Sequence, residues 1–154
     1  MKTKFLFFAT VALIFISADV YSQCQGKCKN GRGTYTYPDG ESYDGLFVNG
    51  KFEGQGTFIY RSGAKYEGNF KDGKRSGKGT YTYPTGDVYT GDFVNGLADG
   101  KGMYSFKNGD KYTGDFKADK RSGKGTYVFA NGTKQVGVFE NGAIVEEVSL
   151  ERKK

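Results

Sequence analysis

The sequence contains no His, no Trp, only two Cys and only two Pro among its 154 residues. Without His, the protein lacks the commonest general base and the commonest metal-binding side chain. Two Cys cannot form a four-ligand zinc site on their own. The sequence therefore argues against His-based catalytic triads, zinc hydrolases and structural zinc fingers, and we expect no cofactor.

What the chain has in abundance is Gly, with 25 residues, and aromatic side chains, which make up 16% and are all Phe or Tyr. A disordered glycine-rich chain would be poor in aromatic residues. A compact enzyme seldom gives so many positions to Gly. The length favours a single domain, and the composition favours a glycine-rich fold that is not an enzyme.

The first 22 residues have the layout of a secretory signal peptide. Lys2 and Lys4 precede an uncharged apolar stretch over Phe5–Ala18, and cleavage after Ser22 is favoured over cleavage after Ala18. The alternative, an uncleaved membrane anchor, would need about 20 apolar residues. We therefore expect export to a periplasm, a cell envelope or the extracellular space.

Cys24 and Cys28 lie in a short N-terminal cap that we expect over residues 23–30. In an oxidising compartment, a local disulfide between them is the expected arrangement. A redox-active pair is the alternative, although the two-residue spacing and the helical context typical of such pairs are missing.

A repeat of 23 residues covers most of the remaining chain. The motif Tyr-x-Gly-x-Phe begins at Tyr43, Tyr66, Tyr89 and Tyr112. A degenerate fifth copy begins at Gln135, which stands where the other copies have Tyr. A second motif, Gly-x-Gly, keeps the same step and begins at Gly31, Gly54, Gly77, Gly100 and Gly123. Alternating aromatic residues follow each Gly-x-Gly, and a turn such as PDGE at 38–41 comes next.

This pattern predicts one β-hairpin in each repeat. Alternation with a period of two is typical of strands, and Gly supplies the positive φ of tight turns. The first hairpin would have strands over 33–37 and 42–48, and a looser loop would lead to the next hairpin. One face would carry the aromatic residues and glycines, and the other would carry polar residues such as Thr34 and Asp44. Stacked hairpins would give an all-β fold, an elongated single-layer antiparallel sheet of about ten strands.

These motifs resemble the MORN (membrane occupation and recognition nexus) repeat, whose pattern is YxGxW/F followed by GxGxxxxxxG at a 23-residue step. The resemblance covers residues 31–142, as about five repeats with the first and last partial. This sequence has Phe where the family often has Trp. The resemblance implies an exported, bacterial-type repeat protein with a curved antiparallel sheet that serves as an interaction scaffold. Phospholipid binding is also proposed for the family, and no catalytic domain fits in this chain, so we expect no enzymatic activity.

A second period, of 46 residues, gives alternate inter-repeat loops a basic character. The sequence KRSGKGTY at 74–81 recurs unchanged at 120–127. One interpretation is an anion-binding edge for lipid headgroups or another polyanion, formed by Lys74, Arg75, Lys78, Lys120, Arg121 and Lys124. The other interpretation, which we favour, is a solvated edge that was copied by duplication.

The aromatic face is the second candidate surface. A groove of exposed rings would bind an extended peptide, a glycan or a partner helix. In a single-layer sheet these rings are also the only core available, so most of them must be structural. The repeated members are Tyr43, Phe47, Tyr66, Phe70, Tyr89, Phe93, Tyr112 and Phe116.

Other site classes fit the sequence poorly. Gly77-Lys78-Gly79-Thr80 precedes a predicted strand, whereas a phosphate-binding loop precedes a helix. Asp92 and Asp115 occupy one repeat position and have no second acid or base placed around a pocket. The small positive net charge and the expected export argue against a nucleic acid partner.

Residues 143–154 leave the repeat, and we expect them to cap the sheet as a last strand or one helical turn. A long exposed edge favours pairing with another chain, so an edge-to-edge homodimer stays open. The sequence thus predicts an exported, non-enzymatic scaffold that binds a protein partner. The alternative function is peripheral binding to an anionic membrane surface through the basic loops.

Overall fold

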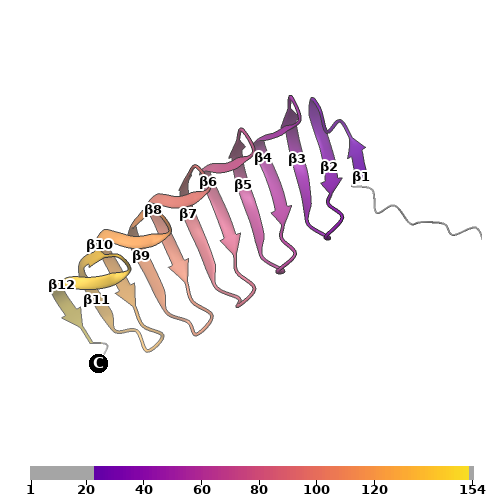
Figure 1. Cartoon of the computed structure of the whole chain (residues 1–154). Coiled ribbons are helices and arrows are strands. Elements are labelled where there is room, and N and C mark those ends of the chain that lie inside the picture. Colours follow the sequence, from indigo (N-terminus) through magenta and orange to yellow (C-terminus); the bar gives the residue numbers. More distant parts are fainter. Residues whose placement is uncertain (1–22, 153–154) are drawn as a thin grey trace, which may run out of the picture.

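The computed structural model describes residues 23–152 as one row of twelve strands (Figure 1). Every strand is antiparallel to the strand that follows it in the chain, and the order in the sheet is the order in the sequence. The predicted all-β, elongated single-layer sheet is confirmed. The predicted signal peptide, residues 1–22, lies outside the described residues. The strands are β1 (Gln23–Gly26), β2 (Gly31–Thr36), β3 (Ser42–Val48), β4 (Lys51–Ile59), β5 (Lys65–Lys71), β6 (Lys74–Thr82), β7 (Val88–Val94), β8 (Leu97–Ser105), β9 (Lys111–Lys117), β10 (Lys120–Val128), β11 (Lys134–Glu140) and β12 (Ala143–Glu151).

A continuous row of glycines crosses the sheet from β2 to β11. Each glycine of the row lies directly opposite the next on the neighbouring strand, in the order Gly33, Gly45, Gly56, Gly68, Gly79, Gly91, Gly102, Gly114, Gly125 and Gly137. Because these residues have no side chains, the row leaves a strip of bare backbone on which larger groups can lie.

The tyrosine of each Tyr-x-Gly-x-Phe motif lies flat on this strip. Tyr43, Tyr66, Tyr89 and Tyr112 are the most deeply buried large side chains, with at most 1% of their surface exposed. The hydroxyl of Tyr89 reaches across the glycines and donates a hydrogen bond to the Asp92 carbonyl at 2.9 Å. The other three tyrosines donate in the same way to the carbonyl three residues further on.

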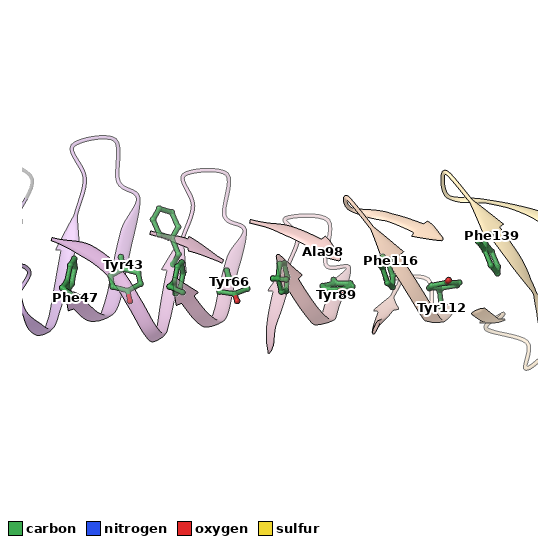
Figure 2. Packing of buried hydrophobic residues seen from close by; sticks show 11 residues of the cluster. Tyr43, Phe47, Tyr66, Tyr89, Ala98, Tyr112, Phe116 and Phe139 are labelled. Carbon is green, nitrogen blue, oxygen red and sulfur yellow. The ribbon is translucent and has the colours of Figure 1, made fainter. Parts of the chain in front are cut away.

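The phenylalanines of the motif stand on edge between these tyrosines (Figure 2). The ring centroids of Tyr66 and Phe93 are 5.0 Å apart, and their planes are inclined by 81°. Tyr89 and Phe116 repeat the contact at 4.8 Å. Such edge-to-face pairs contribute about 0.5–1.5 kcal/mol beyond the burial of apolar area. The core is therefore one continuous file of rings along a single-layer sheet.

The connection predicted as a looser loop is instead a two-residue turn. Asn49 and Gly50 both have positive φ, 50° and 75°, and they join β3 directly to β4. Two central residues with positive φ define a type I′ turn, for which Asn-Gly is the preferred sequence. Because the turn is so short, the strand that follows is nine residues long and begins at Lys51.

The nine-residue strands β4, β6, β8 and β10 each contain a bulge, and this bulge explains the first glycine of Gly-x-Gly. Gly45 pairs with Gly56, but the next residue, Leu46, pairs with Glu53, so two residues of β4 have no partner on β3. The bulged Gly54 has a φ of +60°, which favours glycine. The second glycine of the motif, Gly56, belongs to the row beneath Tyr43. The two glycines therefore have different roles.

The contact between tyrosine and glycine row predicts that Gly102→Ala destabilises the protein strongly. A Cβ at Gly102 would lie 2.5 Å from Tyr89 Cε2 and 2.6 Å from its hydroxyl oxygen. We expect a loss of about 3 kcal/mol of unfolding free energy from the forced displacement of the ring, measured by urea denaturation. Gly40→Ala is the matched control, because its Cβ would meet nothing within 4 Å and only its positive φ would cost about 1 kcal/mol. Equal losses in the two variants would contradict the contact.

Candidate functional site

A second file of rings runs beside the buried core on the aromatic face, and we call it the ring row. Neighbouring rings are 4.5–4.8 Å apart within a repeat and 5.5–6.2 Å apart between successive repeats. Apart from the buried Phe58, these rings keep part of their surface exposed. The ring row consists of Tyr35, Tyr37, Phe58, Tyr60, Tyr81, Tyr83, Tyr104, Phe106, Tyr127 and Phe129.

On the other side of the buried tyrosines, one residue per repeat occupies what we call the cover position. This residue is the second of each nine-residue strand and pairs with the motif phenylalanine of the preceding strand. In the first repeat, Phe52 stacks on Tyr43 with the ring centroids 3.8 Å apart. The cover position is held by Phe52, Arg75, Ala98, Arg121 and Ile144.

The two arginines at the cover position bind within the protein. The Arg75 guanidinium carbon lies 4.8 Å from the centre of the Tyr81 ring and 5.4 Å from that of Phe93, and the group donates a hydrogen bond to the Gly96 carbonyl. Arg121 repeats this arrangement and donates to the Gly142 carbonyl at 2.5 Å. A guanidinium over aromatic faces gains cation–π stabilisation.

Backbone hydrogen bonds tie each type I′ turn to the cover residue of the repeat before it. The Gly73 amide donates to the Phe52 carbonyl at 2.9 Å, and the Gly96 amide donates to the Arg75 carbonyl at 2.9 Å. The Asp119 amide bonds to the Ala98 carbonyl in the same way. These bonds lie outside the strand ladder, so they fix the turns against the cover residues.

Three cavities open on the aromatic face between the cover residues and the ring row. Their volumes are about 290, 300 and 260 Å³. The first is lined in part by Phe52, Tyr60 and Arg75, and the third in part by Arg121 and Phe129. We call the stretch that holds these cavities and the ring row the aromatic groove.

The opposite, polar face carries paired charges. Lys78 bonds Asp92 at 2.7 Å, and Lys101 bonds Asp115 at 2.5 Å. The hydrogen bond from Lys78, supported by one from the Lys101 amide, lowers the pKa of the Asp92 carboxyl. A groove of about 810 Å³ follows the glycine row on this face. Because each aspartate is held by a lysine, neither is placed as a free acid or base.

The sequence model of one repeat family matches five successive segments of the chain. The MORN repeat model matches residues 29–42, 43–65, 66–88, 89–111 and 112–134. The chain belongs to the MORN repeat family. No curated protein matches the chain in sequence.

Solved structures resemble the MORN array only distantly. The TCP domain of Drosophila melanogaster SAS-4, in complex with a proline-rich motif of Ana2, has 19% identity and a TM-score of 0.45 over 79% of this chain and 81% of that chain. The TCP10 domain of Danio rerio CPAP has 12% identity and a TM-score of 0.37 over 80% of this chain and 64% of that chain. The same domain with a STIL peptide has 12% identity and a TM-score of 0.32, covering 79% and 61%.

The six basic residues predicted to form one edge lie in strands of the MORN repeats and point to both faces of the sheet. The prediction of basic loops is therefore wrong, because the two-residue turns leave no room for them. Arg75 and Arg121 lie over rings on the aromatic face. Lys78 lies on the polar face and is paired, and Lys124 lies opposite Val138 there. Lys74 and Lys120 are exposed at the first position of β6 and β10.

The two ends of the array differ from its repeats. Cys24 and Cys28 form a disulfide, and Cys28 packs against the aromatic core beside Gly33. At the other end, residues predicted as a last strand or a helical turn form β12, which pairs with β11. Val145 and Val148 on β12 have 59% and 66% of their surface exposed.

The described residues lack two kinds of feature. Within 23–152, no group of three or more His, Cys, Asp or Glu could hold a metal ion. In the same part of the chain, no helix has the length and apolar character needed to cross a membrane.

The cover position was missed in the sequence analysis, although a signal for it is present. Its members are spaced by 23 residues, but they share no chemistry, since Phe, Arg, Ala and Ile all occur there. They are recognised as one position only once the type I′ turns are located, because each is the second residue after such a turn and faces the buried tyrosine of its repeat.

The contacts of Arg121 predict a structural role that its neighbour Lys120 lacks. Arg121→Ala would lose the cation–π contacts and the hydrogen bond to Gly142, and we expect a loss of about 2 kcal/mol of unfolding free energy. Lys120→Ala, on an exposed side chain of the same strand, should change it by less than about 0.5 kcal/mol. Urea denaturation of both variants tests this, and indistinguishable midpoints would show that Arg121 is a surface charge.

The buried tyrosines predict a loss of stability at alkaline pH. Burial raises the pKa of Tyr43, Tyr66 and Tyr112 to about 12, above the ordinary value of 10.0. Their contribution to stability is therefore complete below pH 10 and is lost as the pH rises toward 12, because the unfolded state ionises first. We expect the urea midpoint to fall over that interval, and to fall less in Tyr66→Phe. Phenolate absorbance that titrates in one step near pH 10 would contradict the prediction.

Proposed function

We propose that this MORN repeat protein is an exported, non-catalytic scaffold that binds an extended segment of a protein partner along its aromatic groove. The observation that carries the proposal is the ring row, which the buried core does not cover. Partly exposed tyrosine and phenylalanine rings are the side chains that protein interfaces favour as anchors. Family membership supports an interaction role, and the leader-like first 22 residues support export.

The shape of the groove favours an extended occupant. Its three cavities follow one another along the array, each beside a cover residue and rings of the ring row. Successive repeats lie about 10 Å apart, the width of two strands. An extended chain spans about 3.3 Å per residue, so its every third residue meets an equivalent point of the groove.

Binding to an anionic membrane is the weaker explanation of the basic residues. Arg75 and Arg121 already hold backbone carbonyls on one face, and Lys78 already holds Asp92 on the other. A membrane surface would need the charges on one side of the sheet. Edge-to-edge pairing through β12 is also disfavoured, because Glu146, Glu147 and Glu151 charge this strand and two register shifts interrupt its pairing with β11.

Site-specific photo-crosslinking tests the proposed function. A photoreactive phenylalanine analogue replaces Phe129, which lines the groove with 36% of its surface exposed, in cells that express the full chain. The matched control places it at Val94, which is 51% exposed and is next to the inward-facing Phe93, so it points to the polar face. We expect a discrete protein adduct from position 129 and none from position 94.

Salt and vesicles separate the two functions. An adduct that persists at high salt supports an aromatic groove, whereas binding through surface charges weakens as salt increases. If position 129 gives no adduct and the protein sediments with phosphatidylglycerol vesicles but not with phosphatidylcholine vesicles, the protein-binding proposal is overturned in favour of membrane binding.

A further inference from the structure

Two departures from the repeat coincide at one point of the groove. Ala98 is the smallest residue at the cover position, where the neighbouring repeats have Arg75 and Arg121. Asp119 is the only residue other than glycine at the second position of the type I′ turns of residues 23–152. The two are in direct contact, because an Asp119 carboxylate oxygen accepts a hydrogen bond from the Ala98 amide at 2.7 Å.

The conformation of Asp119 is one that favours glycine. Its φ is +67°, and the preceding Ala118 also has a positive φ, 47°. Asp is one of the few residues with a side chain that enter this region, though less readily than glycine. The equivalent turn residues are glycines, such as Gly96 and Gly142. The repeat therefore carries a carboxylate where its backbone geometry favours glycine.

The neighbouring repeats show what the space beside Ala98 is built to hold. Arg75 places its guanidinium against Tyr66, Tyr81 and Phe93 and donates to the carbonyl of the turn residue 21 positions later. Arg121 does the same one repeat beyond Ala98. At Ala98 the rings and the turn are retained, but the guanidinium is missing.

The open space is a cavity of about 300 Å³ that contains a carboxylate. It is lined by Ala98 and Asp119, by Arg75, and by the rings of Tyr81, Tyr83, Tyr89 and Phe93. Figure 2 shows Ala98 and Tyr89 side by side in the file of buried residues. All three cavities of the groove are lined by an arginine and by rings, and among them only this one also has an acidic residue in its lining.

Two opposite charges line this cavity, those of Asp119 and Arg75. No ion pair among residues 23–152 involves Asp119. The Arg75 guanidinium donates its hydrogen bond to the Gly96 carbonyl, so it keeps its positive charge without contacting Asp119 in an ion pair. After burial, the negative charge of Asp119 is the next largest cause that raises the pKa of the Tyr83 hydroxyl, and the positive charge of Arg75 lowers that pKa.

We propose that the cavity beside Ala98 receives the guanidinium of an arginine from the partner segment. The planar cation would lie beside the partly exposed Tyr83 ring, and the Asp119 carboxylate would accept its hydrogen bonds. The inference rests on the proposed function and adds to it the chemistry of the partner. An arginine in an extended segment is the element that the groove recognises.

Amide chemical shifts of the ¹⁵N-labelled protein, purified from cells that express the full chain, test the proposal. The probe is N-acetylarginine methylamide, and the lysine and leucine analogues are the comparison ligands. We expect the arginine probe to shift the amides of Ala98 and Asp119 at lower concentration than either analogue does. Equal shifts with the leucine analogue would show a merely apolar cavity and overturn the proposal.

Two variants that copy residues of the neighbouring repeats act as controls. Ala98→Arg should abolish the shifts, because its own guanidinium would compete with the probe for the Asp119 carboxylate. Asp119→Gly gives the turn the residue of Gly96 and should weaken binding about fivefold, the effect of losing one partly exposed charge pair. Unchanged affinity in Asp119→Gly would overturn the proposal even if Ala98→Arg proved unstable.

The crosslinking experiment separates failure of this inference from failure of the proposed function. An adduct from position 129 that is unaffected by Ala98→Arg, together with no selective arginine binding, refutes the arginine but leaves the groove as a protein-binding surface. If position 129 gives no adduct in the protein that keeps Ala98, the proposal that the groove binds a protein is itself refuted. Loss of the adduct in Ala98→Arg, with arginine-selective shifts in the parent protein, supports both.

Discussion

The contact between a tyrosine ring and a pair of facing glycines is the constraint on which the whole structure depends. A single-layer sheet has no second layer to bury its side chains, so its core must lie on the sheet itself. The glycine row makes this possible, because the rings of Tyr43, Tyr66, Tyr89 and Tyr112 lie against bare backbone and become almost completely inaccessible. The motif phenylalanines then close the gaps between tyrosines as edge-to-face neighbours.

The same constraint leaves the candidate binding surface, the aromatic groove. One file of rings is enough to form the core, and the ring row beside it stays partly open to solvent. The cover residues change the lining of the space between the core and the ring row. Phe52 stacks on Tyr43 and Arg75 lies over Tyr66, whereas the cavity beside Ala98 also includes the carboxylate of Asp119. Core and candidate site are thus made from the same 23-residue unit, and the local character of the groove changes with one side chain per repeat.

Much of the fold could be predicted from sequence because the relevant signals are local. The alternation around Gly45 places β3 at Ser42–Val48, as predicted, and the 23-residue step predicts the stacking. The loop between repeats was predicted wrongly, because the Asn49-Gly50 turn signal was not separated from the general abundance of glycine. Because the loop was predicted wrongly, the basic residues were also wrongly predicted to lie together along one edge. Once Lys74–Lys78 are in a strand, alternation sends Arg75 and Lys78 to opposite faces. The cavity beside Ala98 depends on a contact 21 residues away, which no local pattern shows.

The hydrogen bonds between turns and cover residues also bear on how the chain folds. Each of them joins residues 21 positions apart, and every strand pairs only with the strand before or after it. Contacts of such short sequence separation are closed at a low entropic cost and are associated with rapid folding. A chain that emerges gradually from a ribosome or a translocation pore can therefore add one hairpin at a time to a preformed end. Only about one repeat needs to remain unfolded at any moment, so folding can keep pace with synthesis.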